Sequence, residues 1–445
     1  MTRNRSHGWR AFGALVLPIT LFFAACGGDD DDDDATGDDT EESADGEDGD
    51  LAGTTVTIFG PEVEQELQGF SDSFADFEEE TGITVEIQGD RGFEQQIGVR
   101  VDGGDPPDIA MFPQPGKIRD FADDLKPLPD NVLSLVEENF TPAFTDFVDI
   151  DGTIRAVPAK ADLKSLVWYS PAAFEEAGYE IPETQEELRD LADTMIADGN
   201  TPFCLGLGSD EATGWPLTDW IEDTMLRMKG PDVYDQWYQH EIPFNDPDVV
   251  EVGQYVDDFL STPGMVFGDL ENSPSTTFQD AGLPLLDGDC MMHRQGNFYV
   301  ANWPEGTTFG EDGDVNTFYF PTFEDSEFQN VILGGGIYAA PFADRPEVMK
   351  TLEFIASTDF ANARASQPVG GFLSPNINVD RSAYQRPIEG GAFSDTLADA
   401  ETLRFDASDL MPGGGQDFWS AVVNIATGTD VETAFTEVED SWPTE

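Results

Sequence analysis

The chain has 445 residues and carries 90 acidic against 21 basic side chains, a formal net charge of −69 at pH 7. Residues 1–26 contain three Arg and no carboxylate, and residues 27–50 contain 14 carboxylates and no base, so residues 51–445 carry a formal charge of −58. Such a surface repels nucleic acid and anionic lipid headgroups, which excludes a nucleic-acid partner. We attribute the acidic excess, as a hypothesis, to adaptation to a saline environment.

The N-terminus is typical of an export signal. A cationic start precedes an apolar run over residues 11–25, which is too short for a membrane-spanning helix. The stretch Phe23–Cys26 resembles a bacterial lipobox, in which the Cys is acylated and becomes the mature N-terminus, although Leu is usual where Phe23 stands. We therefore expect a signal peptide over residues 1–26 and an extracytoplasmic protein, lipid-anchored through Cys26 to the outer face of the cytoplasmic membrane. The alternative is an ordinary cleaved signal with an incidental Cys26.

Residues 27–50 are predicted to form a disordered acidic tether. They include six consecutive Asp and no aliphatic residue larger than Ala. Such a segment cannot bury enough apolar surface to offset its ordering entropy, and its charges repel one another. Calcium binding is the alternative function, but the spacing of an EF-hand loop is absent from this stretch.

Three cysteines occur in the chain. If Cys26 carries the lipid, Cys204 and Cys290 are left, and a lone pair in an oxidising compartment is expected to form one disulfide. The alternative is a pair of free buried thiols.

The body opens with an alternation of strands and helices. Apolar residues at three- and four-residue spacing predict helices, and β-rich or alternating runs predict strands. The predicted order is strand, helix, strand, helix, strand, over Thr55–Phe59, Leu67–Thr81, Ile83–Ile87, Phe93–Val101 and Asp108–Phe112. This order predicts a parallel α/β sheet.

Ligands of parallel sheets bind beyond the carboxyl ends of the strands. The residues that follow the three predicted strands should therefore surround one pocket. The candidates from these strand ends are Phe59, Gly60, Asp90, Arg91, Phe112 and Gln114.

Several stretches together resemble family 1 solute-binding proteins of ABC importers, the group that includes the maltose-binding protein. The stretch Phe74–Phe112 carries the first part of the resemblance. Lys164–Tyr169 is similar to the strand that first crosses between lobes, and Gly334–Ala339 to the strand that returns. The surroundings of Cys204 and Cys290 are similar to the alpha-glucoside-binding branch in particular.

This resemblance implies an α/β fold of the type II periplasmic-binding-protein kind. Each lobe is then a mainly parallel sheet flanked by helices, with the ligand cleft between the lobes. The implied boundaries are 51–163 and 319–373 for lobe I, and 164–318 and 374–445 for lobe II. The implied partners are a sugar and a membrane-embedded ABC permease. We expect a monomer with no catalytic residue, cofactor or metal.

Sugar binding requires aromatic rings for the C–H-rich sugar face and planar polar groups for the hydroxyls. Trp215 is the best stacking candidate, at a predicted loop-to-helix start, although it would serve equally well in the core of the second lobe. The Gly-rich stretch at Gly335 offers backbone N–H groups, a flexible joint or a close strand crossing. The full set of further candidates is Lys164, Trp215, Asp219, Gln295, Asn297, Trp303, Gly335, Gly336, Gly371, Phe372, Asp417 and Trp419.

Two other classes of protein remain as alternatives. A secreted glycoside hydrolase needs two carboxylates facing the scissile bond, and the many Asp and Glu residues cannot exclude such a pair by counting. The chain has no nucleophile-elbow motif and no His pair at zinc-helix spacing. A surface adhesin more often has internal repeats. We therefore favour a sugar receptor that binds without catalysis.

Overall fold

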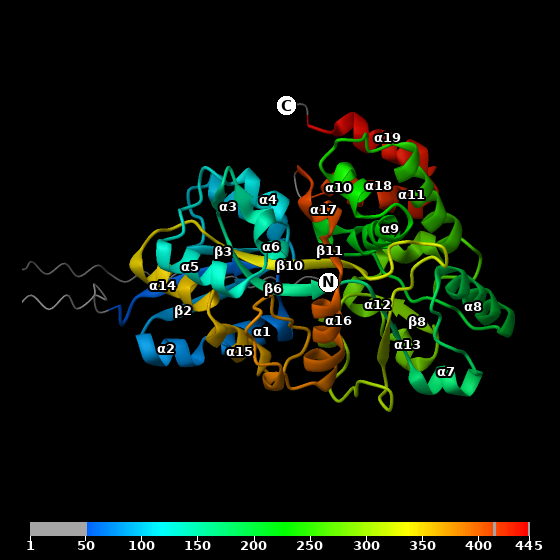
Figure 1. The fold of residues 1–445 in the computed structure, drawn as a ribbon, viewed down its shortest axis with the longest axis horizontal. Coiled ribbons are helices and arrows are strands. Elements are labelled where there is room, and N and C mark those ends of the chain that lie inside the picture. Colours follow the sequence, from blue (N-terminus) through cyan, green and yellow to red (C-terminus); the bar gives the residue numbers. More distant parts are fainter. Residues whose placement is uncertain (1–50, 413–414, 444–445) are drawn as a thin grey trace, which may run out of the picture. The chain divides into compact units, whose positions relative to one another are not determined.

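Two larger β-sheets organise the residues that the computed structural model describes, which are 51–412 and 415–443 (Figure 1). The predicted signal peptide, tether and lipidated Cys26 lie outside these residues. Among the described residues, no helix combines the length and the apolar character needed to cross a membrane.

The N-terminal strands pair as the sequence predicts. Strand β1 (Thr55–Gly60) is parallel to both β2 (Thr84–Gly89) and β3 (Ile109–Phe112), and α3 (Phe93–Asp102) connects β2 to β3. Helices connect these strands and cover the sheet, as expected for a parallel arrangement. The predicted parallel α/β start of the chain is confirmed.

The first predicted helix is two helices, α1 (Glu64–Asp72) and α2 (Ala75–Thr81). Between them the Ser73 hydroxyl donates a hydrogen bond to the carbonyl oxygen of Phe70 at 2.5 Å. Such a local side-chain bond competes with continuation of the helix. Gly82, with φ of 71°, then ends α2 in the left-handed conformation that glycine adopts without strain.

Three later strands complete the six-stranded sheet. Strand β10 (Val331–Pro341) runs antiparallel to β3 and to β6 (Val157–Leu163), and parallel to β11 (Thr402–Phe405). The opposite directions follow from the chain path, because β6 leads out of this sheet towards the second one and β10 leads back in.

The second sheet contains β7 (Leu166–Tyr169) between β8 (Met292–Arg294) and β9 (Asn316–Tyr319). Both pairs are antiparallel, so the expectation of a mainly parallel sheet in lobe II is wrong for these three strands. The antiparallel pairing of β7 with β9 follows from the direction in which the chain runs through each strand. Strand β7 carries the chain away from the first sheet, whereas β9 begins the return that leads into β10.

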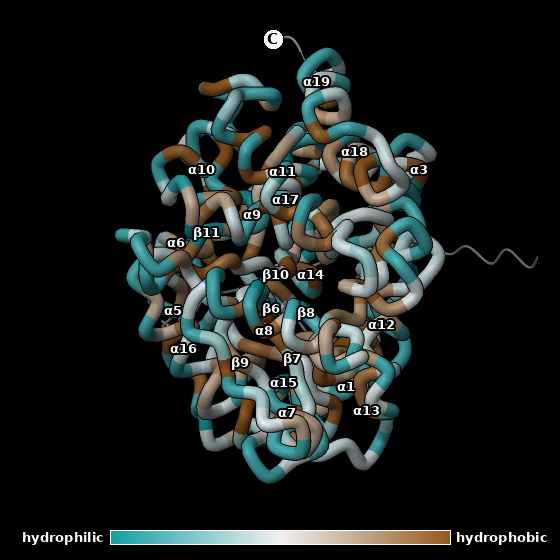
Figure 2. The backbone as a smooth tube through the Cα atoms, turned by 90° about the vertical axis from the view of Figure 1, so that its right-hand side faces the viewer, coloured by the Kyte–Doolittle hydropathy of each residue, from teal (hydrophilic) through white to brown (hydrophobic). Residues whose placement is uncertain are grey.

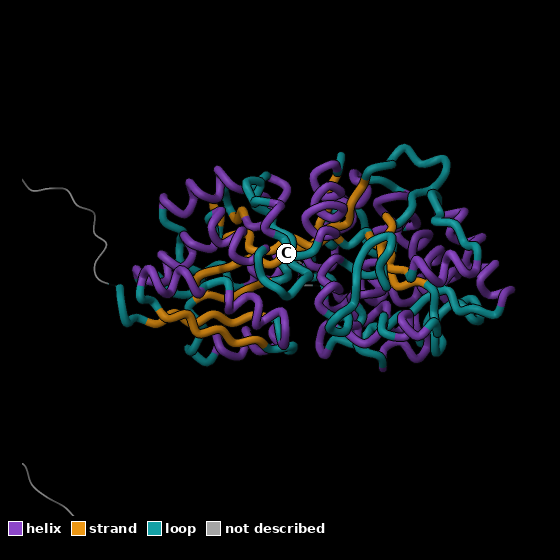
Figure 3. The backbone as a smooth tube through the Cα atoms, turned by 90° about the horizontal axis from the view of Figure 1, so that it is seen from below, coloured by secondary structure: helices purple, strands orange, loops and turns teal. Residues whose placement is uncertain are grey.

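Helices surround both sheets (Figure 3). Around the first sheet lie α4 (Pro115–Asp120), α5 (Asp130–Asn139), α6 (Pro142–Thr145), α14 (Pro346–Ile355), α15 (Thr358–Ala365), α16 (Ser394–Asp399) and the short hairpin β4 (Asp149–Ile150) and β5 (Thr153–Ile154). Around the second lie α7 (Pro171–Ala177), α8 (Gln185–Asp198), α9 (Trp215–Met228), α10 (Pro231–Tyr238), α11 (Pro247–Leu260), α12 (Phe278–Ala281) and α13 (Pro284–Asp287).

The C-terminal segment contributes to both halves of the described body. Helix α17 (Ala407–Leu410) directly follows β11 of the first sheet, whereas α18 (Gln416–Ala426) and α19 (Val431–Ser441) pack with α9 and α11. Apolar segments, including part of α18, lie between more hydrophilic outer loops (Figure 2). We propose the lobe boundaries 51–163 and 319–373 for lobe I, and 164–318 and 374–445 for lobe II. The chain leaves the first sheet at Leu163 and enters the second at Leu166.

Cys204 and Cys290 form the predicted disulfide. Their Cα atoms are 5.5 Å apart, and 86 positions separate them in the sequence. Both are buried in the core that also contains Trp168 and Trp303, so the bond ties the loop before α9 to the residues that lead into β8.

Candidate functional site

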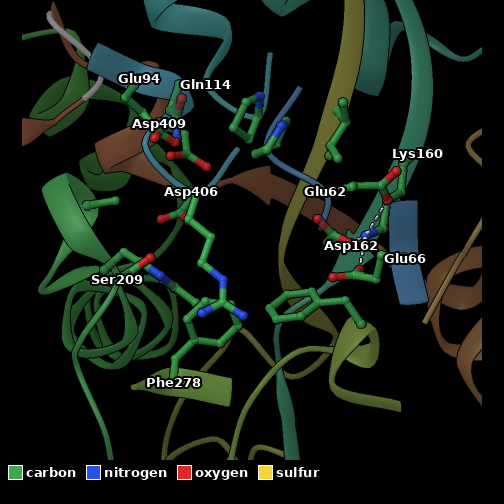
Figure 4. Close-up of a pocket in the computed structure, with 18 of the residues that line it drawn as sticks. Glu62, Glu66, Glu94, Gln114, Lys160, Asp162, Ser209, Phe278, Asp406 and Asp409 are labelled. Carbon is green, nitrogen blue, oxygen red and sulfur yellow. Dashed lines mark hydrogen bonds and ion pairs between the residues drawn. The ribbon is translucent and has the colours of Figure 1, made fainter. Parts of the chain in front are cut away.

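A cavity of about 170 Å³ opens beyond the carboxyl ends of β1 and β3 (Figure 4). One side consists of residues that follow these strands, together with the β6 and β10 crossing. The other side consists of Trp215 at the N-terminus of α9, Phe278 and Gln279 of α12, and Phe298. The cavity thus has walls from both sheet regions.

Three partly exposed aromatic rings form one face of this cavity. The Trp215 ring lies edge-on to Phe278 and to Phe298, with centroids 5.0 and 5.9 Å apart, and the two Phe rings are 6.4 Å apart. Trp215 begins α9 immediately after Gly214, which has φ of 120°, and a Cβ there would lie 2.3 Å from the Trp419 carbonyl oxygen. The glycine therefore allows α9 to start against Trp419, which places Trp215 at the cavity.

Lys160 lines the cavity among three carboxylates, with its Nζ 5.8 Å from the centre of the Phe298 ring. Its Nζ is 3.4 Å from Glu62, 3.1 Å from Glu66 and 3.9 Å from Asp162 (Figure 4). Burial alone would lower the pKa of Lys160, but these carboxylates outweigh it and the pKa is raised. Lys160 is therefore charged at neutral pH.

Lys164 occupies the floor of the cavity. Its Nζ is 3.1 Å from Asp219, also pairs with Asp406, and lies 5.0 Å from the centre of the Trp215 ring. Burial raises the pKa of Asp219 to about 7, with the Asp406 charge adding to burial, despite the opposing charge of Lys164. Burial alone would raise the pKa of Asp406, but the charge of Lys164 and hydrogen bonds with Lys164 and the neighbouring acids together outweigh it, and the pKa is lowered.

Behind Lys164, helix α9 presents a fully buried ionic face to the strand crossings. Asp223 accepts hydrogen bonds from Arg294 at 2.8 Å and from the Ser165 hydroxyl at 2.9 Å, and it also pairs with Arg227. The Ser165 oxygen in turn accepts a hydrogen bond from the amide of Leu333 at 2.9 Å. One helix face thereby connects both strands that join the two sheets.

A third part of the wall contains Glu94, Gln114 and Asp409. The Gln114 amide donates a hydrogen bond to Glu94 at 3.2 Å. Burial raises the pKa of Glu94 and, more strongly, that of Asp409, where the neighbouring Asp406 charge adds to burial.

Carboxylate oxygens of Asp219, Glu222 and Asp406 lie within 4.8 Å of one another. Such a cluster has the chemistry of a cation site. The ammonium of Lys164 already pairs with two of the three carboxylates, so the chain supplies a cation here itself.

Six of the residues predicted from the sequence line the cavity. The structure brings together Arg91, Gln114, Lys164, Trp215, Gly336 and Trp419. At Gly336 the backbones of β10 and β6 approach closely, since a Cβ there would lie 2.4 Å from the Lys160 carbonyl oxygen. Gly335 lies beside it on β10, facing Asp162 of β6 in the sheet register.

A second cavity, of about 460 Å³, adjoins the first. The two share Val63, Glu66, Arg91 and Gln279 as walls. Trp303, another predicted residue, lines this second cavity.

The remaining candidates line neither cavity, and each is buried or hydrogen-bonded elsewhere in the protein. Phe59 and Phe112 are core residues, and Gly60 lies where a Cβ would be 2.8 Å from Met111. Asp90 accepts a hydrogen bond from the Gly92 amide, and exposed Asp417 accepts one from Ser441.

Residues near the crossings are similarly occupied. Asn297 is fully buried and bridges the Leu163 amide, at 2.6 Å, to the Gly371 carbonyl, at 3.1 Å. Gln295 is buried and accepts a hydrogen bond from the amide of its neighbour Gly296, while Phe372 packs against Tyr384. Asp219 lies behind Lys164 without lining the cavity.

Sequence reasoning missed most of the polar wall and two of the three exposed rings. The missed lining residues are Glu62, Glu66, Glu94, Lys160, Asp162, Ser209, Phe278, Gln279, Phe298, Asp406 and Asp409. One signal was available: the chain has only six Lys, and two of them, at positions 160 and 164, lie four residues apart at the first crossing.

Comparison with known proteins identifies the family. Residues 60–358 match the family model described as bacterial extracellular solute-binding protein. The osmoprotective compounds-binding protein GgtB of Synechocystis is 37% identical, over 89% of this chain and 94% of its own. The alpha-glucosides-binding periplasmic protein AglE of Rhizobium meliloti is 38% identical, over 88% of each chain.

The fold is also similar to that of solved structures. The maltose-bound MalE3 of T. maritima superposes with a TM-score of 0.67 at 18% sequence identity, covering 87% of this chain and 98% of that one. The extent of the family match and the identity to two relatives over nearly their full length lead to one conclusion: this chain belongs to the bacterial extracellular solute-binding proteins.

Proposed function

We propose that this protein captures an uncharged sugar, an alpha-glucoside or another small oligosaccharide, outside the cytoplasm and delivers it to a membrane-embedded ABC permease. The observation that carries the proposal is the cavity with Trp215, Phe278 and Phe298 on one face and carboxylate and amide groups on the other. The two relatives named above bind osmoprotective compounds and alpha-glucosides, which agrees with this class of ligand.

The chemistry of the cavity suits a pyranose. Its C–H-rich face can pack on an exposed ring, and its hydroxyls can pair with planar groups such as Gln114 and Glu94. A hydroxyl that is buried without a partner costs about 1–3 kcal/mol, so these polar groups select between sugars while stacking adds affinity.

The adjoining second cavity favours an oligosaccharide over a single sugar unit. It continues from the first cavity past Arg91 and Gln279 towards Trp303. A ligand with one unit on the three rings can extend a second unit into this space.

Closure of the two lobes about the crossings would bury the ligand, with binding energy selecting the closed state. At the first crossing, Lys164 lines the cavity, and the hydroxyl of its neighbour Ser165 donates a hydrogen bond to Asp223 on the ionic face of α9. These residues therefore connect ligand contact to the crossing segments about which the lobes would close.

We further propose that Cys26 is acylated and that residues 27–50 tether a monomeric receptor to the outer face of the membrane. The lipid raises the concentration of loaded receptor near the permease. Mass spectrometry of the mature N-terminus tests the acylation. An unmodified residue there would refute it.

The catalytic alternative is a glycoside hydrolase. The matched relatives are named as binding proteins, which favours binding without turnover. Incubation with an oligosaccharide panel separates the two classes, because a hydrolase releases monosaccharide and a receptor does not.

A thermal-shift screen identifies the ligand. Trehalose, sucrose, maltose, longer glucosides and polyols are compared at matched concentrations, since a ligand that binds the folded state raises the melting temperature by mass action. We expect at least one neutral saccharide to raise it in a saturable manner. If no saccharide does so, the sugar assignment is wrong.

A further inference from the structure

Two buried acids in the cavity wall have no cationic partner. Glu94 and Asp409 are 7% and 8% exposed, and neither forms an ion pair with any residue that the structure describes. Other carboxylates of the cavity region differ in this respect, because the nearby Lys160 and Lys164 each pair with at least two of them. Figure 4 shows Glu94, Gln114 and Asp409 gathered on one part of the wall.

Two oxygen atoms in this group also lack hydrogen-bond partners. They are Oε2 of Glu94 and Oε1 of Gln114, both buried. The other ends of these side chains bind each other, through the Gln114 amide and the second Glu94 oxygen at 3.2 Å. Buried polar atoms without partners in a cavity wall are the groups that a ligand hydroxyl would satisfy.

The surroundings of Asp409 disfavour a negative charge on it. Asp406 precedes it on the same segment, Glu94 approaches from α3, and Asp219 contributes from α9. Lys164 is the cation whose charge lowers the pKa of Asp409, but its ammonium contacts Asp219 and Asp406 instead of Asp409.

The other elements packed against α17 supply no ion-pair partner to Asp409 among the described residues. From α4, Lys117 pairs with Asp120 at 3.4 Å and Arg119 donates a hydrogen bond to the Phe147 carbonyl oxygen at 3.5 Å. From β10 the Tyr338 hydroxyl faces it, from α9 Glu222 binds the Ser408 amide, and Tyr234 of α10 donates to the Phe405 carbonyl. Arg404 of β11 is held by Asp235.

Glu94 has a similar environment. Burial raises its pKa, the Glu211 charge raises it further, and the hydrogen bond from Gln114 and the charge of Lys117 only partly oppose this. Two buried acids on one part of the wall oppose each other's ionisation, which favours a proton on one of them.

We propose that Glu94 and Asp409 form a proton-bearing acid pair that makes this receptor select uncharged, hydroxyl-rich solutes over anionic ones. The protonated carboxyl donates a hydrogen bond to a solute oxygen, and the free oxygens of Glu94 and Gln114 accept hydrogen bonds from solute hydroxyls. This inference rests on the proposed sugar-binding function and names the charge state of the solute.

Rejection of anions follows from the same geometry. A solute carboxylate at this wall would meet acidic groups that form no ion pair, and it has no hydroxyl proton to give to the open oxygens of Glu94 and Gln114. Specificity then arises from repulsion and unpaired acceptors as well as from attraction to the correct solute.

The pair also predicts a pH dependence of known sign. A carboxyl whose pKa is raised in the folded state contributes stability below its unfolded pKa, and that contribution is lost as the pH rises through the folded value. Binding that uses the proton weakens over the same range. Both effects therefore run from stronger at acidic pH to weaker at alkaline pH.

The first test needs no ligand. Free energies of unfolding are measured in urea from pH 5 to pH 9 for the wild-type protein, for Asp409→Asn, and for the control Asp190→Asn at an exposed site on α8. The amide cannot ionise, so we expect the Asp409→Asn protein to gain stability relative to wild type as the pH rises. A difference that is constant across this range would overturn the acid pair, and the Asp190→Asn control should show such a constant difference.

The second test compares maltose with maltobionate, its anionic aldonic acid, by calorimetry at several pH values. We expect the wild type to bind maltobionate at least tenfold more weakly, and its maltose affinity to fall as the pH rises. Asp409→Asn, whose amide donates at every pH, should lose that fall, and Glu94→Gln should narrow the gap between the two ligands.

The outcomes separate the two levels of the proposal. Binding of maltose without pH dependence, or equal binding of maltobionate, overturns the acid pair and leaves sugar capture intact. Failure of both maltose and the wider saccharide panel to bind overturns the proposed function and the selectivity together.

Discussion

At the scale of single residues, exposure separates the tryptophans that face the cavity from those that stabilise the core. Trp215 and Trp220 both lie on α9, yet the Trp215 ring is partly exposed beside Phe278 and Phe298, whereas Trp220 is 2% exposed among core residues. Trp419 is buried and also lines the cavity. Identical side chains on one helix therefore have different roles because of their position along it.

Replacement of Trp215 by Ala should weaken sugar binding at least tenfold, about 1.4 kcal/mol, and leave the melting temperature nearly unchanged. The ring offers a stacking surface to the ligand and is not part of the buried core. Calorimetric titration with the sugar found by the thermal-shift screen measures the affinity.

The matched variant is Trp220→Phe, which removes part of a buried ring. We expect it to lower the melting temperature and to change affinity little. Large unfolding of Trp215→Ala with intact residual affinity would assign Trp215 to the core instead.

At the scale of elements, α9 combines an apolar and an ionic face that are both buried. Leu217, Ile221 and Met225 pack into the core. Asp219, Glu222, Asp223 and Arg227 recur at helical spacing and are fully buried against the strand crossings. The N-terminus of the same helix carries Trp215. One helix thus connects ligand contact to the segments about which closure would occur.

Removing one partner of this ionic face should be strongly destabilising. Asp223→Ala leaves Arg227 and Arg294 buried without their shared carboxylate, which typically costs about 3–5 kcal/mol. Urea unfolding at neutral pH measures the loss. Asp190→Ala, exposed on α8, should change stability by less than about 0.5 kcal/mol, and a comparably small loss for Asp223→Ala would show that the buried network contributes little.

At the scale of the whole molecule, negative charge dominates. Inside the cavity each Lys is surrounded by carboxylates, and outside it the formal charge of −58 on residues 51–445 has few cations to balance it. Self-repulsion of this kind opposes the compact state and is screened by salt.

Salt should therefore stabilise the protein. We expect the melting temperature of residues 51–445 to rise steadily from low to multimolar KCl, as cations screen the acidic surface. Calorimetric melting at fixed pH measures this effect. A melting temperature that is flat or falls with KCl would contradict the proposed adaptation to a saline environment.

Local patterns were enough to predict the first three strands, their parallel pairing, the helix between β2 and β3, and the Cys204–Cys290 disulfide. They were also enough to predict that residues after β1, β2 and β3 meet, since Pro61, Arg91 and Gln114 share one cavity. The strands, the helix and the shared cavity follow from hydrophobic periodicity, turn residues and the geometry of parallel sheets, which act over a few residues at a time. The disulfide follows instead from the cysteine count, because assigning Cys26 to the lipid leaves a single pair.

The polar wall and two of its rings depended on tertiary structure. Asp406 meets Lys164 across 242 positions, and Phe278 and Phe298 face Trp215 from two separate short helical segments. In a chain with 90 carboxylates, composition cannot identify the few that are buried, because burial and pairing depend on distant segments. The sequence by itself therefore determined the fold class, the family resemblance and the sign of the surface charge. Only the tertiary structure decided which acids surround the cavity and which of them lack a cation.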